Sequence, residues 1–138
     1  MLYAVIDTNV IVSALMNIDS VPGLVIKQAL MGSIIPVLHD YIVSEYMEVL
    51  QRKKFGFPQS FVDTVIARFK SRGVFVEAAD MNISMPDPKD EIFYTVALAA
   101  REYIDVNTYI ITGNIKHFPQ VSFAVTPREA LNLLLLGG

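Results

Sequence analysis

The first dozen residues of the chain place an acidic side chain directly after a strongly apolar run. Residues Leu2–Ile6 are apolar and rich in β-formers, and Asp7 ends the run. Such a run predicts a strand buried on both faces, as in a parallel sheet. Ionised carboxylates are costly to bury unless they are paired, hydrogen-bonded or bound to metal, and open α/β sheets bind ligands at the carboxyl ends of their strands. Asp7 is therefore a candidate site residue. The alternative is that Asp7, Thr8 or Asn9 merely caps the following helix.

Four further apolar runs predict strands, and segments of helical periodicity separate them. The runs cover residues 34–38, 74–76, 108–112 and 122–125. Helices are expected at about 8–15, 22–31, 40–53, 58–72, 87–103 and 127–136. Strands that alternate with helices predict an α/β fold. We therefore expect three layers, α/β/α, around a central, mainly parallel sheet of five strands, and a single domain over residues 1–138.

Several residues are typical of helix ends. Gly32 is expected to end the helix before the second strand, and Asp40 is expected to cap the helix after it. Thr126-Pro-Arg-Glu129 matches a capping box with proline at the first helical position.

Composition limits the possible classes of function. Apolar residues make up 53% of the chain and charged residues 18%, which argues against disorder. The lack of cysteine excludes disulfides, thiol catalysis and cysteine metal sites, and it fits a reducing cytoplasm. No apolar run is long enough to span a bilayer, and the N-terminus lacks the basic region of a signal peptide. We therefore expect a cytoplasmic protein with no membrane partner. At a formal net charge of −3, nucleic acid would have to be bound by local basic patches.

Polar side chains stand at four places next to the predicted elements. Asp7 follows the first strand, Glu45 lies on the helix after the second, Asp87 and Asp90 open an alanine-rich helix, and Asn114 follows the fourth strand. The first and fourth strands would be neighbours where a doubly wound sheet reverses its order, which is where ligands bind. Converging carboxylates are tolerable when a divalent cation neutralises them, and oxygen ligands without His or Cys select Mg²⁺ or Mn²⁺. Such ions activate water and bind phosphate oxygens, which suits phosphodiester hydrolysis.

Each of these residues also has a purely structural interpretation. Capping of its helix is the favoured role for Asp87. Asp90 suits the helix dipole, although we favour a metal role for it. Glu45 and Glu48 lie near one face of one helix, and only one of them is expected to point into the crevice. Asn114 follows a glycine and could simply form the turn after the strand.

Four segments, in this order, resemble the PIN-domain ribonucleases. They are Val5-Ile-Asp7-Thr-Asn-Val10, Ser44-Glu45-Tyr46-Met-Glu-Val-Leu50, Asp87-Pro-Lys-Asp90 before the alanine-rich helix, and Ile110-Ile-Thr112-Gly-Asn114-Ile-Lys-His-Phe118. The set is especially similar to the toxins of bacterial type II toxin–antitoxin pairs, and the resemblance covers nearly the whole chain. It implies a PIN-like fold, a Mg²⁺- or Mn²⁺-dependent endoribonuclease activity, and often a homodimer inhibited by an antitoxin.

The resemblance also implies roles for individual residues. Asp7 would be the first metal ligand, Glu45 the second acid and Asp90 the third. Asn114 holds the place where many members carry a fourth acid, which weakens a second metal site more than the first. Supporting roles, in which hydroxyls and amides orient the carboxylates or the water, fall to Thr8, Asn9 and Thr112, with Asp87 and Asn114 beside them.

Other families match less well. A receiver-type phosphoacceptor domain needs an acid pair after the first strand, and a haloacid-dehalogenase-type phosphatase needs Asp-x-Asp there, whereas Asn9 stands at that second position. A serine–histidine triad is disfavoured because the chain has only His39 and His117. A dinucleotide fold would need a glycine-rich turn after the first strand, and this chain has none there. The remaining alternative is a PIN-like domain that binds RNA or a protein partner without cutting.

Basic and apolar residues indicate partners. Candidate RNA contacts are Arg52, Lys53, Lys54, Lys116 and His117, with Arg68, Lys70 and Arg72 as further candidates, although a solvated helix end is the commoner role for such residues. The four leucines at 133–136 cannot all face one side of a helix, so some must pack against something outside it. Together with the high apolar content, this predicts a homodimer.

Overall fold

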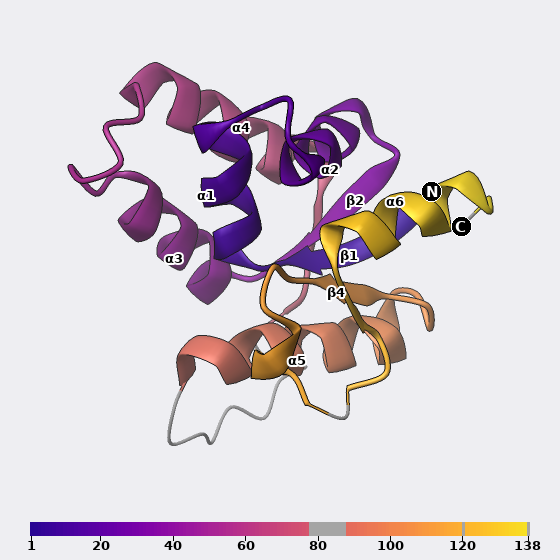
Figure 1. The fold of residues 1–138 in the computed structure, drawn as a ribbon. Helices are drawn as coiled ribbons and strands as arrows, with labels where there is room; N and C mark the ends of the chain where they lie inside the picture. The colour runs from indigo at the N-terminus through magenta and orange to yellow at the C-terminus, as the bar shows by residue number, and fades with distance from the viewer. Residues whose placement is uncertain (78–87, 120, 138) are drawn as a thin grey trace.

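Figure 1 shows the computed structural model, which describes residues 1–77, 88–119 and 121–137, and the backbone alone at residues 88–90. The elements, in chain order, are β1 (Leu2–Ile6), α1 (Thr8–Met16), α2 (Val21–Met31), β2 (Ile34–Leu38), α3 (Asp40–Leu50), α4 (Gln59–Arg72), β3 (Val74–Phe75), α5 (Pro88–Tyr103), β4 (Tyr109–Ile111), the 3₁₀ helix η2 (Ile115–His117), β5 (Ala124–Val125) and α6 (Pro127–Leu135).

In the described part of the chain, five strands form one parallel sheet in the order β3-β2-β1-β4-β5. β1 is the central strand, since residues 2–4 pair with β2 and residues 4–6 pair with β4. All of its residues except Tyr3 are buried, which accounts for the unbroken apolar run. The predicted α/β class with a parallel five-stranded sheet is confirmed, and β1 and β4 are neighbours as predicted.

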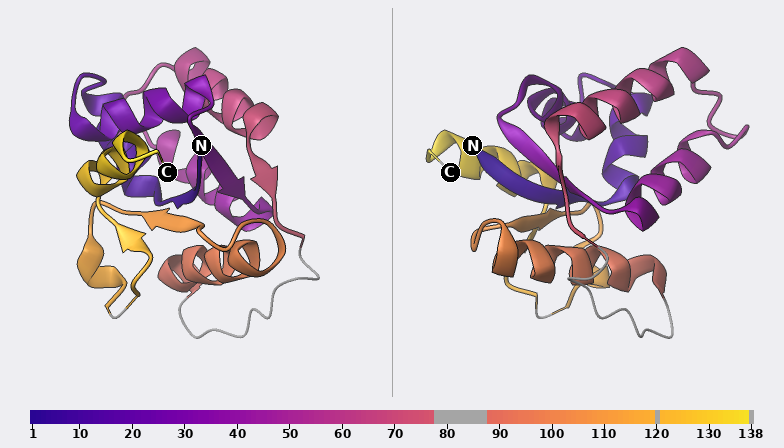
Figure 2. Two further views of the ribbon diagram at one scale, coloured as in Figure 1. Left: turned by 90° about the vertical axis from the view of Figure 1, so that its right-hand side faces the viewer. Right: turned by 180° about the vertical axis from the view of Figure 1, so that it is seen from behind.

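Helices cover both faces of the sheet, as Figures 1 and 2 show. α5 lies along one face, where it contacts β1, β2 and β4. The helices α1 to α4 contact one another and pack together on the other face. The predicted three-layer arrangement is therefore confirmed. Because α1 and α3 directly follow parallel strands, both helices begin at the carboxyl edge of the sheet.

Helix ends follow local rules, with one exception. Gly32 ends α2 in the left-handed conformation (φ +99°), and Thr126 forms the predicted capping box with Glu129. The expectation that Asp40 caps α3 is wrong. His39 is the N-cap, and its Nδ1 accepts the Tyr41 backbone N–H at 3.2 Å. Asp40 lies in the first turn, where a negative charge suits the helix dipole.

The expected end of α3 near Lys53 is also wrong, since the helix stops at Leu50. Leu50 is the last buried apolar residue of the helix. Residues 51–54 are exposed and polar, so a further turn would bury no apolar surface. Arg52 instead turns back to Glu48, with 2.7 Å between Nη2 and Oε2.

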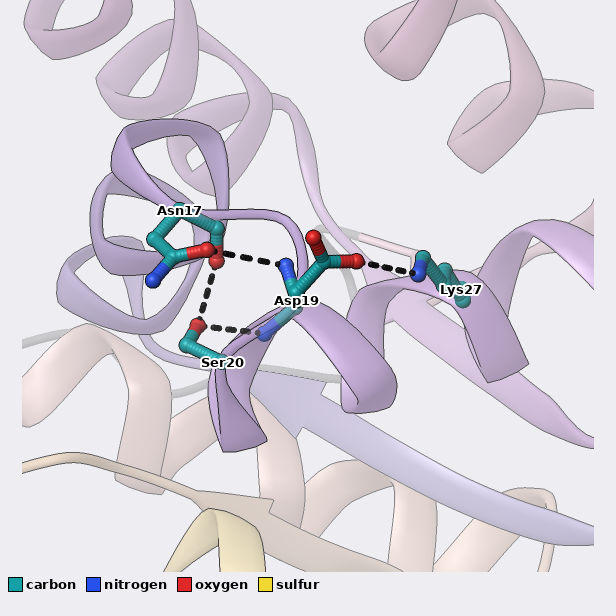
Figure 3. Close-up of polar contacts among 5 residues, drawn as sticks. Asn17, Asp19, Ser20 and Lys27 are labelled. Atoms are coloured by element: carbon teal, nitrogen blue, oxygen red, sulfur yellow. Dashed lines mark hydrogen bonds and ion pairs between the residues drawn. The ribbon is translucent and has the colours of Figure 1, made fainter.

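The turn between α1 and α2 is built from polar side chains (Figure 3). Ser20 caps α2 by accepting the Gly23 backbone N–H (3.1 Å), and its hydroxyl donates to the Asn17 carbonyl (2.6 Å). Asp19 lies 3.5 Å from the Lys27 ammonium on the next turns of α2. This turn changes the direction of the chain by 106°, and α1 and α2 pack against each other on either side of it.

Within the residues that the structure describes, no single helix is long and apolar enough to cross a bilayer. The pair α1 and α2 meets the length and composition criteria together, but the two helices are bent by 106° at their junction. Their apolar residues Val10, Ile11, Val25 and Ile26 are at most 1% exposed, inside the core.

Candidate metal centre

Asp7 stands at the carboxyl end of β1, where the strand meets α1. Its backbone N–H donates to the Ile111 carbonyl of β4 at 2.8 Å, so the sheet fixes its main chain. The residue is 8% exposed. Although it occupies the N-cap position of α1, its side chain makes no capping hydrogen bond, and Thr8 and Asn9 already lie within the helix. The alternative that these residues serve only as a helix cap is therefore wrong for the Asp7 carboxylate.

Two neutral side chains contact the Asp7 carboxylate. The hydroxyl of Thr112, fully buried at the end of β4, donates to Asp7 Oδ2 at 2.8 Å. The side-chain amide of Asn9 donates to the same oxygen at 3.3 Å. Thr112 Oγ1 in turn accepts the backbone N–H of Asn114 at 3.1 Å. These donors orient the carboxylate without adding a positive charge to it.

The turn after β4 lies close against the start of α1. The Gly113 backbone N–H donates to Asn9 Oδ1 at 3.1 Å. A Cβ at position 113 would lie 3.2 Å from the same oxygen, so a larger residue would press on Asn9. Glycine at this position therefore keeps Asn9 within reach of Asp7. Sequence reasoning predicts a supporting role for Asn114 but assigns none to Gly113.

Glu45 comes from the middle of α3, and its side chain turns towards the same junction. The Thr8 hydroxyl donates to Glu45 Oε2 at 2.5 Å. Glu48, one turn further along the helix, is exposed and pairs with Arg52. The prediction that only one of the two acids points into the crevice agrees with this geometry, and the solvated-face interpretation applies to Glu48.

Tyr46 is a site residue that sequence reasoning missed. Its side chain is fully buried, and its hydroxyl donates to the backbone carbonyl of Ile6, the residue before Asp7. Burial raises the pKa of the Tyr46 phenol well above its ordinary value, and the negative charges of Asp7 and then Glu45 raise it further. Both carboxylates therefore act on one phenol, which stays a hydrogen-bond donor at neutral pH. In the sequence, Tyr46 looks like any other aromatic residue of a protein core.

The Asn114 side chain makes a contact within its own turn. Its side-chain amide lies 2.9 Å from His117 Nε2, within the turn that forms η2. Its backbone reaches the site through Thr112. Lys116 and His117 follow Asn114 on the same short segment after β4.

The remaining predicted acids lie at or beyond the limit of the described residues. Asp87 is outside them, and Asp90 lies in the first turn of α5 with only its backbone described. In both Figure 1 and Figure 2, α5 begins on the side of the sheet where β1 ends. The helix that contains Asp90 in its first turn therefore begins at the carboxyl edge of the sheet.

The donor atoms at this junction fit a hard divalent cation. Asp7 and Glu45 provide carboxylate oxygens, and Thr8 and Thr112 provide hydroxyls hydrogen-bonded to them. Oxygen donors of this kind favour Mg²⁺ or Mn²⁺ over softer metals. Among the side chains that the structure describes, no three His, Cys, Asp or Glu residues form a cluster. A third acid would therefore have to come from a side chain outside that set, and Asp90 is the one that the sequence predicts.

The basic candidates fall into two groups. Lys53 and Lys54 are exposed after α3, and Lys116 is exposed on η2, after β4. Arg68 donates to the Leu30 carbonyl near the end of α2 (3.4 Å), and Arg72 ends α4 just before β3. Because these two arginines precede strands, they lie at the amino edge of the sheet, away from Asp7.

Comparison with known protein families identifies the family of this chain. The family model described as the PIN domain matches residues 3–116, a segment that runs from β1 into η2 and includes Asp7, Thr8, Asn9, Glu45, Tyr46, Thr112 and Asn114. Searches of curated proteins and of solved structures gave no match.

Proposed function

Because the chain belongs to the PIN-domain family, whose members are typically metal-dependent nucleases, we propose that it is an endoribonuclease. It hydrolyses phosphodiester bonds of single-stranded RNA with the aid of Mg²⁺ or Mn²⁺. The observation that carries the proposal is the Asp7 carboxylate, which is 8% exposed, does not cap α1 and is oriented by Thr112 and Asn9. The carboxyl end of a central strand is where open α/β sheets bind ligands, and an oriented carboxylate there suits a hard divalent cation.

The proposed catalytic and metal-binding residues are Asp7, Glu45 and Asp90. When bound, the cation supplies an activated water and neutralises charge on the phosphate. Thr112 and Asn9 orient Asp7, and Thr8 orients Glu45. Oriented oxygens select a productive arrangement in advance of substrate binding.

We propose that RNA is bound by exposed basic residues on the segments that carry the candidate site. Lys116 and His117 follow Asn114 directly, and Lys53 and Lys54 follow the helix that carries Glu45. Arg52 is a poorer candidate because it is engaged with Glu48 at 2.7 Å. The overall negative charge makes these local cations the main attraction for a phosphate backbone.

A role as the cytoplasmic toxin of a toxin–antitoxin pair rests on the resemblance of the four motifs. The exposed end of α6 supports a homodimer. Leu133 and Leu134 are half-buried against the core, whereas Leu135 and Leu136 are 85% and 84% exposed. Large exposed leucines next to each other favour a protein contact.

The nuclease proposal is tested with Asp7 and with Glu45 and Glu48, two acids of α3 that form a matched pair. A labelled single-stranded RNA is incubated with the wild type, Asp7→Asn, Glu45→Gln and Glu48→Gln, each with Mn²⁺ and with chelator. Cleavage should need Mn²⁺ and should be lost in Asp7→Asn and Glu45→Gln. Glu48→Gln should keep it, because Glu48 faces solvent and Arg52.

Cleavage that persists in chelator, or equal activity of Glu45→Gln and Glu48→Gln, would refute the proposed site. RNA binding by the wild type without cleavage of varied RNAs would instead favour a non-catalytic RNA-binding domain. Asn114, whose side chain contacts His117 where many relatives carry an acid, gives that alternative its support.

A further inference from the structure

Two hydrogen bonds attach α3 to the chain on either side of Asp7. Before Asp7, the Ile6 carbonyl accepts the Tyr46 hydroxyl. After Asp7, the Thr8 hydroxyl donates to Glu45 Oε2 at 2.5 Å. Consecutive residues of α3 thus contact the two neighbours of the candidate metal ligand.

The Tyr46 contact is enclosed by the core. Tyr46 and Ile6 are both fully buried, so the Ile6 carbonyl needs a partner from within the protein. The Tyr46 ring packs edge-on against Phe69 of α4, with ring centroids 6.1 Å apart and planes at 82°. Packing therefore fixes the ring, and the hydrogen bond from its hydroxyl holds the end of β1 in place relative to α3.

We infer that Tyr46 is a positioning residue that sets the distance and orientation of the Glu45 carboxylate relative to Asp7. The inference rests on the proposed metal-dependent function. Successive residues of a helix project about 100° apart around its axis. A helix held through both Glu45 and Tyr46 can neither roll nor slide without breaking one of the two hydrogen bonds. Tyr46 acts through Asp7 and Glu45 and needs no contact with the metal or the RNA.

The test compares Tyr46→Phe with Thr108→Val. Both substitutions remove a buried hydroxyl that donates to a backbone carbonyl, since Thr108 donates to Asp105 at 2.7 Å. Thr108 directly precedes β4 and lies at the amino edge of the sheet, far from Asp7. Mn²⁺ affinity of the free protein is measured by isothermal titration calorimetry, below the melting temperature of each variant.

Tyr46→Phe should raise the Mn²⁺ dissociation constant by about tenfold or more, as is usual when a group that orients metal ligands is removed. Thr108→Val should bind Mn²⁺ like the wild type. Wild-type affinity in Tyr46→Phe would overturn the positioning role and leave the nuclease proposal standing. A wild type that binds no Mn²⁺ would overturn both.

If Tyr46→Phe does not fold, the same titration is carried out on Thr8→Val. It removes the other hydrogen bond between α3 and the Asp7 junction, but leaves the Ile6 carbonyl satisfied. The two-point attachment predicts weaker Mn²⁺ binding in Thr8→Val as well, and unchanged binding would overturn it.

Discussion

Replacing Thr112 by valine removes one hydroxyl from the centre of the site while keeping its shape. The hydroxyl is fully buried, donates to Asp7 Oδ2 at 2.8 Å and accepts the Asn114 N–H at 3.1 Å. A hydrogen bond to a charged group contributes about 1.5–3 kcal/mol. Asn114 is only half-buried, so water can take over its N–H. We therefore expect the free energy of unfolding without metal to fall by about 2 kcal/mol.

Thr108, at the other end of β4, provides the control for this measurement. Thr108 and Thr112 lie just before and just after it, and both are fully buried. Thr108→Val removes a bond between neutral groups and should lower the free energy of unfolding by about 1 kcal/mol. Urea denaturation measures both losses, and calorimetry with Mn²⁺ measures their effect on the site.

The two variants should differ most clearly in their affinity for Mn²⁺. Thr112→Val should weaken Mn²⁺ binding by about 10- to 100-fold, because it frees the Asp7 carboxylate to rotate. Thr108→Val should not change it. Equal losses of stability in both variants, with wild-type Mn²⁺ affinity in Thr112→Val, would refute the view that Thr112 orients a metal ligand.

Three further outcomes are expected. Asp7→Asn should not lower stability in the absence of metal, as followed by urea denaturation, because asparagine keeps the acceptor oxygen and removes a charge near Glu45; a marked loss would contradict the mutual repulsion of the acids. The folded-state pKa of Tyr46 is raised, so the contribution of this phenol to stability is complete below the ordinary pKa of about 10 and is lost as pH rises above it. The free energy of unfolding should therefore fall less steeply with alkaline pH in Tyr46→Phe than in the wild type, and identical curves would count against burial of an un-ionised phenol. Replacing Leu135 and Leu136 together by glutamate should give a monomer by light scattering at micromolar concentration where the wild type is a dimer, and a wild-type monomer would remove the dimer proposal.

Much of the fold could be predicted because its signals are local in sequence. The run at Leu2–Ile6 predicts a strand buried on both faces, and the alternation of strands and helices predicts a parallel sheet; a doubly wound order then makes β1 and β4 neighbours, as observed. Thr126 and Glu129 give their capping box from spacing alone. The Asp40 prediction was wrong because His39, one residue earlier, supplies a ring nitrogen as the cap, and aspartate is equally favourable in the first turn.

The contacts within the site could be predicted only in part. The position of Asp7 at the end of a strand follows from the chain, but the choice between Glu45 and Glu48 depends on how α3 is rotated about its axis. That rotation is set by packing of Ile42, Tyr46 and Leu50 against distant segments. Tyr46 itself looks like any core aromatic in the sequence, because a phenol that binds a carbonyl 40 residues away leaves no local signal.

The donors around the acids also bear on why the fold tolerates them. Thr112 and Asn9 contact Asp7, Thr8 contacts Glu45, and all three are neutral. A lysine or arginine in such a place would cancel the negative charge and lower the affinity for a cation. The neutral donors instead fix the direction of each carboxylate and bring no positive charge of their own to it. A cation that binds to carboxylates directed in this way binds the folded protein only, so metal binding and folding stability are expected to rise together by mass action.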